Sequence, residues 1–353
     1  MKKLVLEKAA VAKNIAVIKE KAGKMALYGV LTGDGHGAGL LELAQMLRDA
    51  GITRFAVTEP EDAAALRKAG FTDEELLILR SVMNREELET LIDLNVVFTI
   101  GSSEAGMALN GLAEGRSTVV EAHVEIDTGM GLGGFLPEET DKIFAIYESL
   151  PNVAVSGIFT ETRSTSEKIA EVQLAAFRGV LDAIHQKGFE TGCVHAAGSY
   201  ALLHYGITGM DAARVGTALL GRCRRTRDDK LKKVGYGEVS VEEIRWLPRG
   251  HTVGSERVTT LGKATRVAVL PIGYQNGFAV ARSHGGGLFA AIGGWWARRK
   301  LSVTIGGQKA RVIGHVGATQ TVVNITELKC AAGDVAIFDV DPLYAKGLVR
   351  EYR

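Results

Sequence analysis

Short apolar runs alternate with longer stretches of helical period between about residue 25 and residue 220. The apolar runs are rich in β-branched residues, as strands buried on both faces of a parallel sheet should be. Eight strand–helix units can be counted, with strands expected at Tyr28–Leu31, Phe55–Thr58, Leu76–Leu79, Val96–Ile100, Val119–Ile126, Val155–Thr160, Cys193–Ala196 and Ala212–Gly216.

The segments between these runs carry the start and stop signals of helices. One helix is expected over Pro60–Ala69, with Glu61 and Asp62 in its first turn and Gly70 at its end, and another over Arg85–Leu94. Parallel strands that alternate with helices in eight units predict a (β/α)8 TIM barrel, an α/β fold. An open, doubly wound sheet is the competing architecture.

The pattern changes after Arg222 to β-rich, turn-punctuated sequence without convincing helices. Strands are expected within Gly235–Trp246, Arg257–Val258, Thr265–Pro271, Leu301–Ile305, Ala310–Val316 and Gln320–Ile325. A chain of 353 residues exceeds the usual size of one hydrophobic core. We therefore expect the barrel over residues 1–228 and a mostly antiparallel β-domain over residues 229–353.

The composition is that of an ordinary soluble globular protein, with 46% hydrophobic and 24% charged residues. A net charge of +1 supplies no broad positive field for nucleic acid or an anionic membrane, so a small-molecule ligand is favoured. The stretch 283–300 holds two adjacent tryptophans and three consecutive basic residues. We interpret it as a surface loop rather than a nucleic-acid or membrane contact.

Neither export nor a membrane span is indicated by the sequence. The amino terminus leads into a mixed helical stretch, and no run of about eighteen apolar residues occurs. The cysteines Cys193, Cys223 and Cys330 are far apart and lack ligand-spaced histidines. Their distribution indicates a reducing cytoplasm and no structural metal.

Residues that directly follow the strands are the site candidates, because chemistry in a TIM barrel sits at the carboxyl ends of its strands. The glycine-rich segment 32–39 follows the first strand and lets backbone amides approach a ligand. Asp127 and the two residues after it form either part of a site or a capped turn. Glu161 and Arg163 follow strand six, an acid and a base that by alternation should face the mouth.

Strands seven and eight contribute groups that can hold an anion. His195 and Ser199 belong to the seventh unit, and Arg214 and Gly216 to the eighth, where TIM barrels bind phosphate. Taken alone, His195 is typical of a hydrogen-bonded core histidine and Arg214 of a structural ion-pair partner. Their joint placement favours a ligand.

Five segments together resemble the alanine racemase family. They span residues 28–37, 126–131, 214–216, 250–254 and 271–277, and read YGVLTGDGHG, IDTGMG, RVG, GHTVG and PIGYQNG. The resemblance runs along nearly the whole chain. It implies a pyridoxal-phosphate fold type III barrel with a carboxy-terminal β-domain. It also implies a head-to-tail homodimer in which the β-domain of one subunit completes the barrel mouth of the other, giving composite active sites.

Two positions that the resemblance marks as catalytic carry unsuitable side chains. Thr32 stands where the family has the lysine that forms the Schiff base and works the substrate's α-proton on one face of the cofactor. A hydroxyl cannot form an imine and is a poor base. Ser255 stands where the family has the tyrosine that acts on the opposite face. Both proton-transfer groups are therefore absent.

Further substitutions affect the substrate side of the implied site. Leu132 replaces a family arginine, and Ala318 with its neighbour Thr319 replaces a Met-Asp pair. Leu132, Tyr274 and Ala318 are the positions at which we expect substrate contacts. The side chain of a substrate cannot be inferred from them, because family residues that would shape it are replaced.

The cofactor side of the implied site is partly retained. Ser199 and the Gly216 amide match the family's phosphate holders, and Arg214 matches the arginine that faces the cofactor's ring nitrogen. His36 replaces a phosphate-contacting tyrosine. Glu125 falls where many members carry a carbamylated lysine, so a negative charge can persist there.

Four hypotheses follow from this pattern. In the first, the ancestral racemisation is lost or altered, while the fold and an anionic ligand remain; covalent pyridoxal phosphate is then not expected, and non-covalent pyridoxal phosphate or another phosphate is. In the second, the chain is a working racemase in which His36 or a lysine of the partner chain replaces Thr32. The third is a cofactor-free enzyme that uses Glu161 with His36 or His195 as an acid/base pair. The fourth is a module that binds a phosphorylated small molecule through Ser199, Gly216 and Arg214.

Overall fold

A computed structural model describes residues 1–353 apart from 163–165, 207–208, 224–229, 255–257 and 281–300. The chain divides into two compact units. One is formed by Ala10–Lys233, and the other joins Met1–Ala9 to Val234–Arg353. The predicted bounds 1–228 and 229–353 stay a prediction, since residues 224–229 lie outside the described part. The basic stretch 283–300 lies outside it as well.

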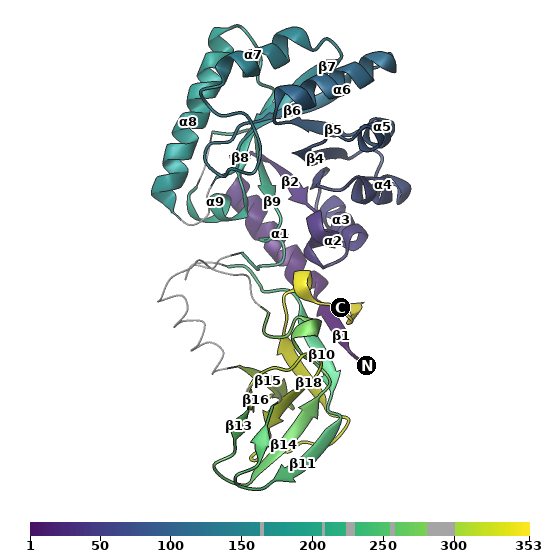
Figure 1. The fold of residues 1–353 in the computed structure, drawn as a ribbon, viewed down its shortest axis with the longest axis vertical. Helices are drawn as coiled ribbons and strands as arrows, with labels where there is room; N and C mark the ends of the chain where they lie inside the picture. Colours follow the sequence, from purple (N-terminus) through teal and green to yellow (C-terminus); the bar gives the residue numbers. More distant parts are fainter. Residues whose placement is uncertain (163–165, 207–208, 224–229, 255–257, 281–300) are drawn as a thin grey trace. The chain divides into compact units, whose positions relative to one another are not determined.

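The first unit is a closed barrel of eight parallel strands, β2 to β9 in sequential order (Figure 1). Its strands are β2 (Ala26–Val30), β3 (Arg54–Val57), β4 (Glu75–Ser81), β5 (Val97–Ile100), β6 (Val120–Glu125), β7 (Val153–Phe159), β8 (Cys193–Ala197) and β9 (Ala212–Val215). Pairing of β2 with β9 closes the barrel. The predicted TIM barrel is confirmed, with strand ends within two residues of those expected, and the open sheet is wrong.

Helices follow the strands around the outside of the barrel (Figure 1). They are α1 (Lys8–Ala22), α2 (Thr32–His36), α3 (Leu40–Asp49), α4 (Pro60–Lys68), α5 (Arg85–Asp93), α6 (Ser103–Gly115), α7 (Thr140–Ser149), α8 (Glu167–Gln186) and α9 (Ser199–His204). Local sequence explains their starts: the side chains of Asn84, Ser102 and Ser166 accept hydrogen bonds from first-turn amides of α5, α6 and α8. The predicted helices Pro60–Ala69 and Arg85–Leu94 are confirmed to within one residue.

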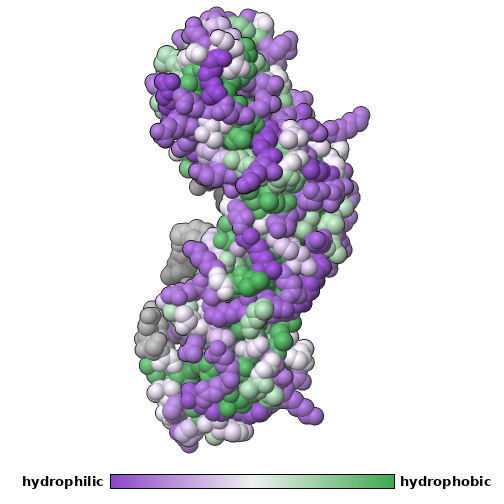
Figure 2. All heavy atoms as spheres, turned by 90° about the vertical axis from the view of Figure 1, so that its right-hand side faces the viewer, coloured by the Kyte–Doolittle hydropathy of each residue, from purple (hydrophilic) through white to green (hydrophobic). Residues whose placement is uncertain are grey.

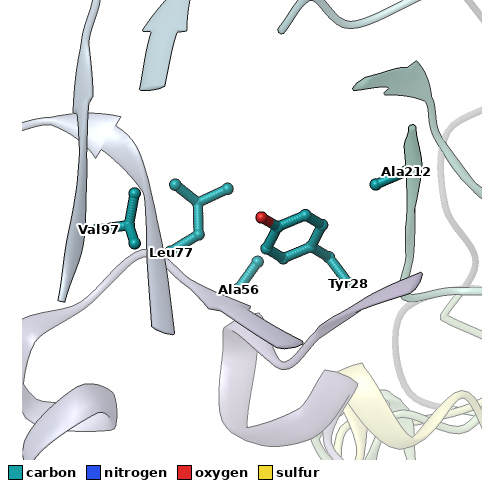
Figure 3. Packing of buried hydrophobic residues seen from close by; sticks show 5 residues of the cluster. All are labelled: Tyr28, Ala56, Leu77, Val97 and Ala212. Carbon is teal, nitrogen blue, oxygen red and sulfur yellow. The ribbon is translucent and has the colours of Figure 1, made fainter. Parts of the chain in front are cut away.

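The interior of the barrel is packed by side chains from several strands. Tyr28, Ala56, Leu77, Val97 and Ala212 form one buried cluster, and the Tyr28 ring lies between Leu77 and Ala212 (Figure 3). The Tyr28 hydroxyl donates to the Glu75 carboxylate. Because Glu75 begins β4, this contact lies toward the amino ends of the strands, the end of a TIM barrel associated with stability rather than chemistry.

The second unit contains a nine-stranded sheet in the order β11-β14-β17-β16-β15-β18-β10-β1-β19. Its strands are β1 (Lys3–Leu6), β10 (Tyr236–Ser240), β11 (Glu243–Leu247), β14 (Thr265–Leu270), β15 (Ser302–Ile305), β16 (Gln308–Val312), β17 (Thr321–Asn324), β18 (Val335–Asp339) and β19 (Val349–Tyr352). A separate pair, β12 (Thr252–Val253) and β13 (Thr259–Thr260), and two short 3-10 helices, η1 (Tyr274–Asn276) and η2 (Pro342–Tyr344), complete it.

This unit confirms the expected β-domain, since its neighbouring strands are antiparallel except for β1 and β19. Gly237 of β10 lies opposite Phe338 of β18, and a Cβ atom there would lie 2.0 Å from the phenyl ring. Glycine at this strand position therefore makes room for the core aromatic residue.

The surface reflects the balanced composition. Hydrophilic residues, in purple, cover most of the face in Figure 2, and hydrophobic residues, in green, appear there as separate patches. None of the described helices combines the length and the apolar character that a membrane crossing requires.

Candidate functional site at the barrel mouth

A cavity of about 350 Å³ opens among the carboxyl ends of the barrel strands. It is lined by residues from β4, β6, β7 and β9 and from the loops that follow them: Leu79, Arg80, Ser81, Glu125, Ile126, Asp127, Met130, Leu132, Gly133, Phe159, Thr160, Glu161 and Arg214. This is the end of a TIM barrel at which chemistry is found. Glu161, Leu132 and Arg214, all predicted site residues, are brought together here.

Arg214 lies at the base of this cavity with its side chain 3% exposed. One terminal nitrogen donates to the Thr160 carbonyl at 2.7 Å and to the Glu161 carboxylate at 2.5 Å. The other contacts Nδ1 of His195 at 2.6 Å. The interpretation of Arg214 as an ion-pair partner is confirmed, and its buried charge is matched by these acceptors.

The contact with Arg214 fixes the tautomers of two buried histidines. A guanidinium only donates, so Nδ1 of His195 accepts and its proton resides on Nε2. That proton is donated to Nδ1 of His123, 2.9 Å away. Burial, followed by the charge of Arg214, lowers the pKa of His195 well below its ordinary value and that of His123 to about 3.

His195 is consequently a neutral, fully buried histidine with both ring nitrogens in hydrogen bonds. This confirms its interpretation as a hydrogen-bonded core histidine. His123 was not among the predicted site residues. Its signal is a histidine in the middle of a predicted buried strand, a position where the imidazole requires polar partners.

Glu161 follows β7, and its carboxylate passes close to Gly198 to contact Arg214. A Cβ atom on Gly198 would lie 2.6 Å from Oε1 of Glu161, so a side chain there would displace the carboxylate. The backbone φ of Gly198 is −82°, which any residue adopts. Its role at this site is therefore close approach rather than backbone conformation. Arg163, predicted to accompany Glu161, lies outside the described residues.

Glu125 ends β6 and lies in the wall of the same cavity. Glycines surround it: Cβ atoms built on Gly101 and Gly133 would lie 3.2 and 3.3 Å from its Oε2 atom. Burial raises its pKa to about 7; Arg214 acts in the opposite sense, and Asp127 and Glu161 add to the rise.

Asp127 holds the loop after β6. Its carboxylate accepts hydrogen bonds from the backbone amides of Gly129, Met130 and Gly131 at 2.8 to 3.1 Å. The capped-turn interpretation is confirmed. The loop carries Leu132, which is 84% exposed at the rim of the cavity.

The first-strand motif forms a left-handed turn. Thr32 begins α2, and residues 33–37 all have positive φ, from 54° to 82°. Glycine occupies three of these five positions, in keeping with its low cost there. The turn is held by Asp34, whose carboxylate accepts from the Leu40 amide at 2.9 Å. It brings the His36 imidazole against β9, where a Cβ on Gly216 would lie 2.2 Å from Nε2.

His36, Ser199 and Gly216 thus gather at the ends of β2, β8 and β9. The Ser199 hydroxyl oxygen accepts from the Gly216 amide at 3.0 Å and from the Ala218 amide at 3.4 Å. Its own proton can be donated to an acceptor. We call His36, Ser199 and Gly216 the phosphate-end group. None of them lines the 350 Å³ cavity, so the group and the cavity are separate parts of the mouth, and both adjoin β9.

Two further predicted residues belong to the β-rich unit. Tyr274 begins η1 and is 48% exposed. The amide of the next residue, Gln275, donates to the Ala318 carbonyl at 3.1 Å, which brings Tyr274 and Ala318 together. Their roles toward a substrate stay predictions. Ser255 lies outside the described residues.

Covalent attachment of pyridoxal phosphate requires a lysine amine. No lysine is among the described residues that line the cavity, and the residue that begins α2 after the first barrel strand is Thr32. At these two places the residues present do not fit a covalently held cofactor. We derive no chemical step through this cofactor.

Family models match both units of the chain. The alanine racemase N-terminal domain matches residues 6–223, and the alanine racemase C-terminal domain matches residues 236–345. The alanine racemase of Halothermothrix orenii is 27% identical over 323 residues, covering 89% of this chain and 80% of that protein. That of Clostridium perfringens SM101 is 29% identical over 338 residues, covering 93% and 82%.

Solved structures share the fold. The alanine racemase of Clostridium difficile 630 superposes with a TM-score of 0.85 at 21% identity, over 100% of this chain and 95% of that one. The alanine racemase of Bartonella henselae with covalently bound pyridoxal phosphate superposes with a TM-score of 0.82 at 20% identity, over 100% and 99%. At this identity the likeness shows the fold alone.

Proposed function

Since this chain belongs to the alanine racemase family, we propose that it keeps the family's fold but has lost or altered pyridoxal-phosphate-dependent racemisation. The observation that carries the proposal is Thr32, which begins α2 two residues after β2 and stands where the family resemblance requires the Schiff-base lysine. Moving an α-proton requires a positioned base on each face of the substrate. Ser255 stands where the family resemblance implies a tyrosine, so the base on the opposite face of the substrate is absent as well.

The retained function is non-covalent binding of a small anionic ligand, with phosphate as the favoured group. Support comes from the Ser199 hydroxyl, whose oxygen accepts from the amides of Gly216 and Ala218 and whose own proton can be donated to a phosphate oxygen. Two backbone amides and one hydroxyl make up this group, so it does not depend on the side chains that are substituted elsewhere in the mouth. Non-covalent pyridoxal phosphate falls within this ligand class. A cytoplasmic homodimer with composite sites completes the proposal.

The cofactor-free enzyme is the second candidate, and one observation limits it. Both ring nitrogens of His195 are engaged and its pKa is low, which disfavours it as a proton acceptor. Glu161 with His36 is the pair that such an enzyme would use. Glu161 is 44% exposed and lines the cavity, so it is the accessible member of that pair.

An absorbance spectrum tests the loss of covalent attachment. The purified chain is mixed with pyridoxal phosphate, scanned, and treated with borohydride, and alanine racemisation is assayed in both directions. We expect no imine band that borohydride removes and no racemisation. An imine band in the wild-type chain, together with interconversion of the alanine enantiomers, would establish the working-racemase alternative.

Thermal-shift measurements with simple phosphate esters test the retained ligand class. We expect stabilisation by alkyl phosphates, and its loss in Ser199→Ala, because that substitution removes the hydroxyl on which two amides converge. Equal stabilisation of wild type and variant would place the phosphate elsewhere.

A further inference from the structure

The charged groups of the mouth cavity can be accounted for one by one. Three carboxylates and two guanidinium groups line it: Glu125, Asp127, Glu161, Arg80 and Arg214. Glu161 and Arg214 pair with each other, and Asp127 accepts three backbone amides of its own loop. Arg80 donates to the Thr58 carbonyl at 2.8 Å and to Glu87 at 2.5 Å.

Glu125 is the remaining charged group. Within the part of the chain that the structure describes, no hydrogen bond or ion pair joins its carboxylate to another residue. Gly101, Gly133 and Gly134 lie close to it, and Arg214, the guanidinium that lowers its pKa, is already committed. An unpaired carboxylate in a partly desolvated wall is costly unless a ligand supplies the missing partner.

The rest of the cavity indicates what that ligand is. Apolar groups of Leu79, Ile126 and Phe159 line it beside the carboxylate, which suits an alkyl chain. Both arginines are engaged, so the cavity offers no uncommitted cation among its described lining residues for a second, anionic group. A metal ion is disfavoured, because no described group of three or more His, Cys, Asp or Glu residues could hold one.

We propose that the Glu125 carboxylate recognises the protonated amine of an alkylamine ligand that enters the mouth cavity. The inference rests on the proposed function, in which the mouth binds a small molecule without a covalent bond. It extends that function by assigning an ammonium to one end of the ligand. The proposed function assigns a phosphate at the other end to the Ser199 hydroxyl.

Binding should displace a proton. A carboxyl group with a pKa of about 7 is roughly half protonated at pH 7, and an ammonium beside it favours the ionised form. An amine-bearing ligand should therefore release about half a proton per site at that pH. A residue with a purely structural role would not give this signal.

The experiment uses the full chain and a series of probes. The dissociation constants of 2-aminoethyl, 4-aminobutyl and 6-aminohexyl phosphate are compared with those of the matching alkyl phosphates and of butylammonium. Calorimetry in buffers of different ionisation enthalpy measures proton release. The variants are Glu125→Gln and, as a control, Glu121→Gln, an exposed glutamate at the opposite end of the same strand.

We expect at least one aminoalkyl phosphate to bind wild type about tenfold more tightly than its alkyl phosphate, a gain of about 1.4 kcal/mol. Glu125→Gln should abolish this advantage and the proton release, while Glu121→Gln should keep both. The melting temperature of each variant verifies that it is folded.

The remaining outcomes separate the two proposals. If alkyl and aminoalkyl phosphates bind wild type equally, the amine inference is wrong and phosphate binding stands. An advantage that persists in Glu125→Gln also overturns the assignment. If no phosphate binds but butylammonium binds wild type and not Glu125→Gln, phosphate binding fails and the amine site stands. Absence of binding by every probe refutes both.

Discussion

Replacing Glu125 by glutamine should remove a pH dependence of folding stability. In the folded chain burial raises the pKa of Glu125 from 4.5 to about 7, whereas the unfolded chain titrates near 4.5. Asp127 and Glu161 add to this rise and Arg214 opposes it. The difference between the two states corresponds to about 3 kcal/mol at most.

The direction follows from proton counting. Between pH 4.5 and about 7 the folded state binds the proton that the unfolded state has lost, so the free energy of unfolding falls as pH rises. The contribution is fully present below pH 4.5 and is lost as pH passes through about 7. Glutamine has no proton to lose in this range and keeps nearly the same shape.

Urea unfolding of wild type and Glu125→Gln at several pH values between about 5 and 8 measures this effect. Helices longer than one turn lie in the barrel unit, so helical circular dichroism follows that unit. Glu121→Gln should run parallel to wild type, because Glu121 is exposed on the same strand. The difference in the free energy of unfolding between wild type and Glu125→Gln should grow with pH. If the free energies of the two proteins run parallel over this pH range, Glu125 is not a buried, unpaired carboxylate.

Three further predictions concern the mouth. Thr32→Lys should give an imine absorbance band with pyridoxal phosphate that borohydride removes, without racemisation, since Ser255 still stands where the family resemblance implies the second catalytic residue, a tyrosine. A spectrum like that of wild type would contradict the assignment of position 32 to the Schiff-base lysine. Gly216→Ala should weaken alkyl phosphate binding at least about tenfold, because its Cβ would lie 2.2 Å from Nε2 of His36. Gly111→Ala, in open space on α6, should leave binding unchanged and stabilise the helix by about 0.5–1 kcal/mol. Glu161→Gln should lower the free energy of unfolding by about 1 kcal/mol in urea titrations, because the carboxylate is 44% exposed and its buried arginine keeps two other acceptors; a loss above about 3 kcal/mol would contradict this estimate.

The barrel strands could be predicted because each is a short apolar run whose signal is local. Strand β1 could not, because it is a strand only through its partners: Lys3–Leu6 lies between β10 and β19, far away in sequence. The same holds for β18, which pairs with β10 and β15, and for β19, whose pairing with β1 brings the two ends of the chain into one sheet. Long-range pairing leaves no periodic mark on a four-residue segment.

Site residues could be located from strand ends, but their partners could not. Arg214, Glu161 and His195 come from three different strands or loops. Closure of the barrel brings Arg214 to 2.6 Å from His195 and to 2.5 Å from Glu161. The buried His123 was missed for the same reason. From the sequence, Glu125 was predicted only to keep a negative charge. The glycines that lie close to its carboxylate come from other segments of the chain and are brought there by folding.

Three of the substitutions in the mouth make its charge more negative. By the family resemblance, Thr32 and Glu125 stand at lysine positions and Leu132 at an arginine position, so positive groups are lost and a carboxylate is gained. The cavity is left with three carboxylates against two guanidinium groups. Such a balance favours a cationic group over an anionic one within the cavity. The group that we propose for phosphate is built from the Ser199 hydroxyl and the amides that donate to it rather than from charged side chains, so this reversal does not change its charge. A ligand that carries an ammonium at one end and a phosphate at the other is therefore the class that we propose for the mouth.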